Sequence, residues 1–457
     1  AGTGGRTASS GSLAAPAVPP QGSPLQDAPR GLPLGRRGFL AAVGAAGAAV
    51  GAAWAGHSFF INKNTPPEGP FPGAFEGPSA AVGHLLRAPG ALPAPSRVEE
   101  VPLAIVGAGI AGLSAGWWLA RQGFSDYKIL ELAAAPGGNA ASGRSPVSAY
   151  PLGAHYVPLP GEEATLVRAL FEELGVIEGY EAGLPRYNPH YLVADPEERL
   201  LIHGRWQAGL VPRFGLSAKD KAGLAAFFAE MEGLRPARGA DGRPAFCIPL
   251  AASSADPALR ALDGQTMAGW LNGRGHTAEA LRWYVDYCCR DDYGAPAAAV
   301  SAWAGLHYFA ARGGRATNAA PGDVLTWPEG NGWLAARLAA PQRARLATGQ
   351  LVYHIENKPN AVEARVLDVA QKSTYTLRAR QLIFAGPQFA AGRAVAGLAA
   401  ARGPALAQLA YAPWLVANVH LSALPPPRRG APLAWDNVPY GGRAAGYESL
   451  GYVVATH

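Results

Sequence analysis

The sequence predicts an α/β fold, in which a parallel sheet flanked by helices is interleaved with a second, α+β domain. Residues 101–106 form a short apolar run that ends in a glycine-rich turn and leads into a helical pattern over 113–123. A second apolar segment, 127–130, follows and ends at Glu131. A strand, turn, helix and strand in this order predict a parallel βαβ unit. A chain of 457 residues is also long for one core, which favours two domains.

The turn after the first strand has the glycine spacing of a dinucleotide-binding loop. It consists of Gly107, Ala108, Gly109, Ile110, Ala111 and Gly112. The first glycine permits a tight turn, the second lets the backbone approach a pyrophosphate, and the third brings the helix close to the strand. Glu131 lies 24 residues after Gly107, where a carboxylate can accept the ribose hydroxyls. The unit therefore predicts a Rossmann-like domain with phosphates at the helix N-terminus.

Charge and cysteine usage exclude two classes of function. Residues 1–97 hold seven basic and three acidic side chains, a net of +4 out of the total of +6. The remaining 360 residues carry +2 without a basic run, so we expect no nucleic-acid partner. The three cysteines (Cys247, Cys288 and Cys289) show no metal-ligand spacing, which predicts buried thiols and no metal site.

The N-terminal region is predicted to be an export leader between two non-globular segments. Arg36-Arg37 followed by Phe39-Leu40 and a long uncharged run resembles a twin-arginine signal over 36–56. The resemblance implies the twin-arginine export machinery as a partner, and a product that is periplasmic or anchored in the membrane facing the periplasm. Residues 1–35 are predicted to be disordered, and 57–97 to be a Pro/Gly-rich linker.

A second glycine pair distinguishes FAD from NAD. Gly137-Gly138 follows Glu131 by six residues and precedes Asn139. This arrangement resembles the FAD-binding members of the amine-oxidase and phytoene-desaturase superfamily, which place paired glycines against the dinucleotide after the ribose-binding Glu. The family usually has Arg at the position of Asn139, so a charge contact to phosphate is absent here. The resemblance implies FAD as the cofactor.

Further segments continue the resemblance in family order. Gly153-Ala154 stands where the family brings the chain beside the flavin ring, which makes the next residues, His155 and Tyr156, weak catalytic candidates. The strand beginning at residues 351–352 matches one whose backbone, at Val352, contacts adenine. Residues 380–387 resemble the family's strand that ends in Ala-x-Pro, which adds Pro387 to the predicted cofactor-binding residues.

The resemblance also implies domain limits. Residues 98–156 and 327–395 would form the two parts of the FAD domain, and 157–326 the substrate domain inserted between them. Residues 396–457 would return to the substrate domain and stop before the family's last FAD motif. Within the insert, the aromatic and acidic stretch 283–294 either shapes a substrate pocket or is a helix end where Arg290 pairs with Asp291 or Asp292.

Three functions follow from these observations. The leading one is hydride transfer from a small amine or a similar C–H donor to flavin N5, with oxygen or quinone as electron acceptor. True amine oxidases hold a Lys in the strand matching 414–421, whereas this sequence has Asn418 and no Lys nearby. The alternatives are a desaturase or isomerase for a lipophilic substrate, and a flavin-binding protein without turnover.

Overall fold

The computed structural model describes residues 73–193, 195, 197–412, 414–421, 423, 426–441 and the strand 453–454. The predicted leader at 36–56 lies outside these residues. Among the helices that are described, none has the length and hydropathy needed to cross a bilayer.

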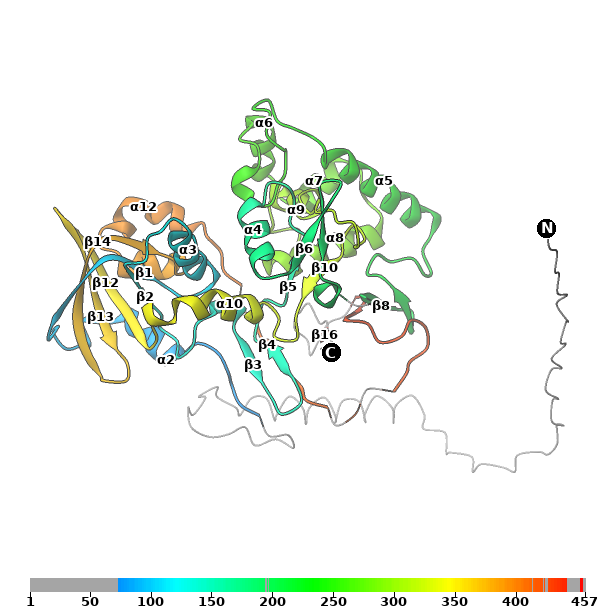
Figure 1. The fold of residues 1–457 in the computed structure, drawn as a ribbon. Helices are drawn as coiled ribbons and strands as arrows, with labels where there is room; N and C mark the ends of the chain where they lie inside the picture. The colour runs from blue at the N-terminus through cyan, green and yellow to red at the C-terminus, as the bar shows by residue number, and fades with distance from the viewer. Residues whose placement is uncertain are drawn as a thin grey trace, which may run out of the picture. The chain divides into compact units, whose positions relative to one another are not determined.

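A six-stranded sheet organises the nucleotide-binding part of the chain (Figure 1). Its strands are β1 (Val98–Val106), β2 (Tyr127–Leu130), β11 (Leu346–Ala347), β12 (Gln350–Lys358), β13 (Ala361–Asp368) and β14 (Ser373–Phe384). The order is β11-β2-β1-β14-β13-β12, with β11, β2, β1 and β14 parallel and the β14-β13-β12 meander antiparallel. The predicted parallel βαβ unit is confirmed.

The alternation of side chains along β1 decides what covers each face of this sheet. Leu103 and Ile105 face a core formed with α3 (Ile110–Arg121) and α10 (Gly332–Ala339). Ala104 and Val106 face the other way, onto the buried side of the β12–β14 meander. Because successive residues of a strand point to opposite faces, one apolar run supplies both cores. The fold is therefore a helix layer, a sheet and a β-meander.

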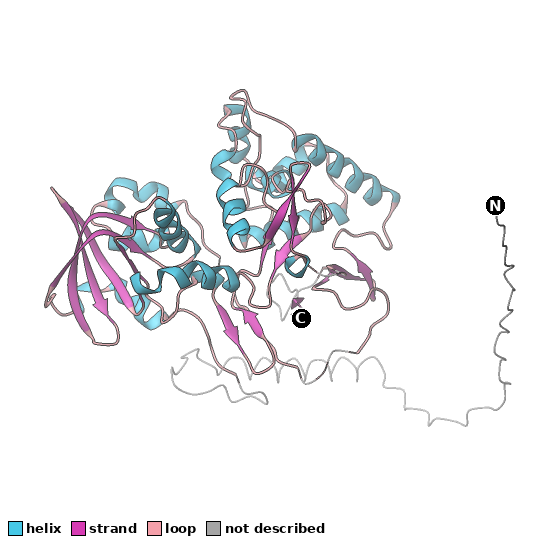
Figure 2. Ribbon diagram, in the orientation of Figure 1, coloured by secondary structure: helices cyan, strands magenta, loops and turns pink. Residues whose placement is uncertain are grey.

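The polypeptide between β1 and β14 also contains a mostly helical region (Figure 2). Its helices are α4 (Thr165–Glu173), α5 (Ala218–Leu234), α6 (Pro257–Arg260), α7 (Met267–Gly273), α8 (Glu279–Tyr293) and α9 (Ala302–Ala310). Helices α5, α7, α8 and α9 share one core that also takes in Leu200, Ile202 and Val438. All three cysteines are buried free thiols, as expected.

Small sheets accompany these helices. They are formed by β3 (Ser142–Arg144) with β4 (Ala149–Pro151), β5 (Tyr156–Pro158) with β10 (Val324–Thr326), β6 (Ile177–Glu181) with β7 (Leu184–Tyr187), and β8 (Glu198–Ile202) with β9 (Arg205–Ala208), β15 (Asp436–Pro439) and β16 (Val453–Val454). Strands β8 and β15 are parallel neighbours although more than 200 residues separate them in sequence.

Three segments differ from the sequence-based expectations. Part of the predicted linker is ordered: α2 (Ala80–Gly83) and the turns after it bury Val82, Leu85 and Leu86 against β12 and β13, because these apolar residues interrupt the Pro/Gly-rich stretch. Residues 414–421 form no strand, since their backbone pairs with no described strand. In the predicted return segment, α12 (Leu398–Ala407) packs on α11 (Gln388–Ala394), which contacts β12 of the large sheet.

Candidate functional site

The bend between β1 and α3 depends on two glycines. Gly107 has a φ of +103°, and its N–H donates to the Leu130 carbonyl at 2.8 Å, which fixes the turn to β2. Gly112 lies directly over this turn, because a Cβ added there would be 1.8 Å from the Gly107 carbonyl oxygen. Only a residue without a side chain permits this approach, as the spacing of the motif predicts.

The first turn of α3 offers free hydrogen-bond donors at this bend. The N-cap residue Gly109 has no side chain to cap the helix, and the first helical bond runs from the Leu113 N–H to the Gly109 carbonyl at 3.0 Å. The N–H groups of residues 110–112 consequently have no partner among the described residues. Unpaired donors at the positive end of a helix dipole suit an anionic ligand.

The second glycine pair lies against the first glycine loop. The Gly137 N–H donates to the Ala108 carbonyl at 2.9 Å, and Gly137 forms a parallel bridge with Gly109. Gly138 has a φ of +56°, and a Cβ added there would be 3.2 Å from the Gly109 Cα. Two motifs that are 28 residues apart in sequence therefore form one continuous backbone surface.

Glu131 stands at the centre of this surface. Its side chain is buried, with Oε2 accepting from the Ala108 N–H at 2.7 Å and Oε1 accepting from the Ala133 N–H at 2.8 Å. A carboxylate oxygen has a second lone pair, so each oxygen can still accept a hydroxyl. The carboxylate is thus held by backbone donors at the glycine bend, where the sequence predicts a ribose.

The third predicted segment is joined to the second. The Ala154 N–H donates to the Asn139 carbonyl at 2.8 Å, and the Ala154 carbonyl accepts from the Asn331 N–H at 3.0 Å. Gly153 allows this contact, because a Cβ there would be 2.7 Å from the Asn139 carbonyl oxygen. Asn331, which sequence reasoning did not assign, also donates through its side chain to the Tyr156 carbonyl at 3.0 Å.

The last two predicted residues have different surroundings. Pro387 is the N-cap of α11 and follows Ala385, whose carbonyl carbon would be 3.2 Å from a Cβ at Gly107. The Ala-x-Pro segment therefore borders the glycine bend. Val352 is buried in β12 within the core that contains Val106, and no described contact joins it to the glycine loops.

The two catalytic candidates are buried next to the Gly153-Ala154 segment. His155 packs on Tyr156 at 5.2 Å and on Trp435 at 5.4 Å between ring centroids, and its Nδ1 lies 3.2 Å from the Gly153 carbonyl. Burial lowers the pKa of His155, which favours the neutral imidazole. Burial raises the pKa of Tyr156, so the phenol keeps its proton.

A buried charged cluster that sequence reasoning missed lies beside these rings. Arg312, just after α9, forms an ion pair with Asp292 at 2.6 Å, and its guanidinium lies 6.0 Å from the Tyr156 ring centroid. Asp291 precedes Asp292 at the end of α8, and Asp436 and Glu198 are paired in the register of β15 and β8. The predicted pairing of Arg290 with its neighbours is replaced by an ion pair one turn back, to Asp286 at 2.7 Å.

The electrostatics of this cluster are dominated by burial. Burial and then the Asp292 carboxylate raise the pKa of Asp291 to about 6. Burial followed by the Glu198 and Asp291 carboxylates holds the pKa of Asp436 well above its usual range. Burial also raises the pKa of Glu198. The carboxyls are therefore short of positive partners.

One consequence concerns stability against pH. Burial, and then the Glu198 carboxylate, raise the pKa of Glu197 from 4.5 to about 8. A raised folded pKa gives stability that is present below the unfolded pKa and is lost as pH rises through the folded one. We expect the unfolding free energy to fall between pH 5 and 8, and Glu197→Gln to remove about 2 kcal/mol of that fall. Denaturant unfolding at both pH values checks this, and equal pH slopes in the two proteins would contradict it.

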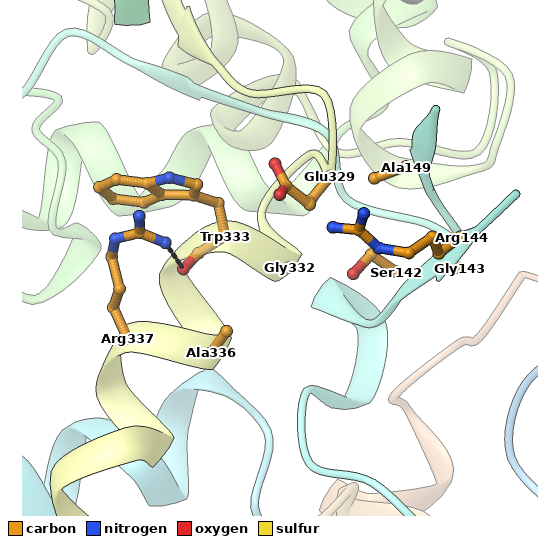
Figure 3. Close-up of a pocket in the computed structure, with 9 residues that line it drawn as sticks. All are labelled: Ser142, Gly143, Arg144, Ala149, Glu329, Gly332, Trp333, Ala336 and Arg337. Atoms are coloured by element: carbon orange, nitrogen blue, oxygen red, sulfur yellow. Dashed lines mark hydrogen bonds between the residues drawn. The ribbon is translucent and has the colours of Figure 1, made fainter. Parts of the chain in front are cut away.

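Two cavities lie near these groups. The smaller, of about 310 Å³, is lined by residues of β3 and α10 (Figure 3). Its Arg337 lies 3.5 Å from the Trp333 ring centroid and so has a partner, and none of its lining residues belongs to the glycine motifs. The larger, of about 800 Å³, is lined by residues of the helical region and reaches Arg312.

Comparison with known proteins gives one family match. Residues 105–174 match the NAD(P)-binding Rossmann-like domain. This stretch begins in β1 and contains both glycine motifs and Glu131. The fold class is therefore α/β with a Rossmann-like nucleotide-binding domain, as predicted. No curated protein matches the chain.

Several solved structures resemble the chain. Wild-type putrescine oxidase bound to putrescine has 18% identity over 65% of this chain and 60% of its own, with a TM-score of 0.47. Cyclohexylamine oxidase from Brevibacterium oxydans IH-35A has 20% identity over 65% and 60%, with a TM-score of 0.46. The CLA-producing fatty acid isomerase from P. acnes has 19% identity over 65% and 61%, with a TM-score of 0.45. The chain spans about 60% of the length of these proteins, and the likeness concerns the fold alone.

Proposed function

We propose that the chain binds FAD at its Rossmann-like domain and is an oxidoreductase that takes a hydride from a small amine or a similar C–H donor. The observation that supports FAD over NAD is the contact between the two glycine motifs. Gly137 and Gly138 lie against Ala108 and Gly109 through a hydrogen bond and a close backbone approach. A second glycine pair at the first loop extends the cradle beyond what one strand–turn–helix unit provides for NAD.

The residues present fit such a cofactor. The free N–H groups of residues 110–112 would hold the pyrophosphate, and the Glu131 carboxylate would accept ribose hydroxyls. Asn139 and the Gly153-Ala154 segment would continue the site toward the ring. When bound, FAD would supply the hydride acceptor, and the protein would supply orientation and electrostatics.

Neutral aromatic side chains would form the wall next to the reacting atoms. His155, Tyr156 and Trp435 pack edge-to-face or tilted against one another, and burial disfavours the charged forms of the histidine and the tyrosine. Such a wall excludes water from the donor carbon and restricts how a substrate enters. Burial leaves His155 with a neutral imidazole that could accept a proton from a donor.

The visible absorption spectrum of the purified full chain tests this proposal. We expect bound FAD with flavin bands, released on denaturation and identified by mass, and anaerobic bleaching by a reactive donor. Hydrogen peroxide release on adding air indicates an oxidase, whereas bleaching reversed only by a quinone indicates a dehydrogenase or desaturase. Exclusive uptake of NAD, or of no dinucleotide, would contradict the proposal.

Glu131→Gln should weaken FAD binding roughly tenfold, because an amide offers one acceptor oxygen in place of two and turns a donor toward an N–H group. Glu181→Gln, at an exposed position in β6, is the matched control and should leave the FAD dissociation constant unchanged. Titration of the apoprotein with FAD measures both. Since Glu131 also holds the Ala108 N–H, the thermal stability of each apoprotein is compared separately. An unchanged FAD affinity in Glu131→Gln would remove Glu131 from the proposed site.

A further inference from the structure

Three carboxyl groups from three different elements lie together beside the aromatic wall. Asp436 of β15 and Glu198 of β8 are direct neighbours in parallel register, so their side chains leave the small sheet on the same face. Asp291, from the end of α8, acts electrostatically on both Asp436 and the Tyr156 ring hydroxyl. These three residues are called the acidic triad below.

One oxygen of the triad has no partner. Asp436 is 9% exposed, and its Oδ1 is buried without a hydrogen bond to any described residue. Leaving a buried acceptor unpaired costs about 1–3 kcal/mol, and more for a charged group. Native proteins rarely retain such a group unless a ligand or a function uses it.

The cation next to the triad is already engaged. Arg312 pairs with Asp292, outside the triad, at 2.6 Å and lies over the Tyr308 ring at 4.1 Å from its centroid. The described residues also contain no group of three His, Cys, Asp or Glu side chains arranged to hold a metal ion. A ligand with several N–H donors and one positive charge would match the triad better than a bare ion, because each carboxyl could accept one hydrogen bond.

The triad is next to the proposed reaction site. Trp435 immediately precedes Asp436 and packs on His155 at 5.4 Å and on Tyr156 at 6.0 Å between centroids. His155 and Tyr156 follow the segment predicted to border the flavin. Arg312 connects the triad to the 800 Å³ cavity, since it lines that cavity and acts on Asp291. A substrate with two ends could therefore reach the aromatic wall and the triad together.

We propose that Asp436, Glu198 and Asp291 bind an alkylammonium group at one end of the substrate, while the C–H bond to be oxidised lies at the other end. The substrate class is then a diamine or polyamine rather than a simple alkylamine. Trp435 and Tyr156 would contact the aliphatic stem and the cation through their rings. This inference rests on the proposed function, because it assigns one end of the substrate to the flavin.

Calorimetric titration of the FAD-loaded full chain with 1,5-diaminopentane and with pentylamine tests the inference. We expect the diamine to bind at least roughly tenfold more tightly, as expected for one added charge-assisted contact. Asp436→Asn should reduce this ratio to about one, and Glu198→Gln should reduce it in the same direction. Glu181→Gln, at an exposed site, is the control and should keep the native ratio.

A second measurement separates a ligand site from a structural role. If the triad serves binding, Asp436→Asn removes a buried like charge and should keep or raise the thermal stability while it abolishes the preference for the diamine. Equal affinities for the two amines in the native protein, no binding of either, or a preference that Asp436→Asn leaves intact would overturn the inference. The proposed function fails separately, through absence of FAD or of bleaching, and the diamine titration remains interpretable on the FAD-free protein.

Discussion

Gly112→Ala should abolish FAD binding. The added Cβ would be 1.8 Å from the Gly107 carbonyl oxygen and 3.3 Å from the Ala385 Cβ, so the first turn of α3 must move away from the bend. That movement displaces the N–H groups of residues 110–112, which would hold the pyrophosphate. We expect at least a hundredfold loss of FAD affinity, together with about 1–3 kcal/mol of destabilisation from overpacking. The ratio of flavin to protein absorbance and the unfolding free energy of the apoprotein measure the two effects.

Two other helical glycines serve as controls for Gly112→Ala. Gly233 in α5 has no atom within 4 Å of an added Cβ, so Gly233→Ala should leave FAD binding intact and stabilise the protein by up to about 1 kcal/mol. Gly116 is in α3 itself, and its added Cβ would meet the side-chain end of Gln342. Gly116→Ala therefore disturbs packing away from the bend and should lower stability more than FAD affinity. Full flavin content in Gly112→Ala would show that the bend does not bind the cofactor.

The nucleotide-binding unit could be predicted because its determinants are local. Gly107, Gly112 and Glu131 are close in sequence, and each is required by a contact inside one βαβ unit. The contact between Gly137 and Gly109 is longer in range, yet the family resemblance implied it. Alternation along β1 likewise fixed two buried faces, because both lie on one strand.

The acidic triad could not be predicted because it is assembled by topology. Asp436 meets Glu198 only through the parallel pairing of β15 and β8, which no local pattern encodes. Arg312 pairs with Asp292 across two helix ends, whereas sequence proximity favoured Arg290. Ionisable residues look alike in a sequence whether they are solvated or buried, so their burial becomes visible only in the fold.

Arg312→Gln should be the most destabilising change among the charged residues described here. The side chain is 24% exposed, and its loss leaves Asp292 without the ion pair and Asp291 without its nearest positive neighbour. Removing one partner of a buried pair costs about 3–5 kcal/mol, because the other charge stays desolvated. Denaturant unfolding at neutral pH measures the loss, and the pKa of Asp291 should rise further above 6.

A double-mutant cycle decides whether this loss comes from the pair. Asp292→Asn in the Arg312→Gln background should recover roughly 1–3 kcal/mol, since the unpaired carboxylate is then gone. The exposed pair of Arg378 and Glu363, at 3.0 Å, is the matched control, and its cycle should give a coupling below about 1 kcal/mol. Coupling energies of equal size at the two pairs would mean that solvent screens Arg312 as fully as Arg378. The carboxyls around Arg312 would then have no shortage of positive partners, and the acidic triad would need no cationic ligand.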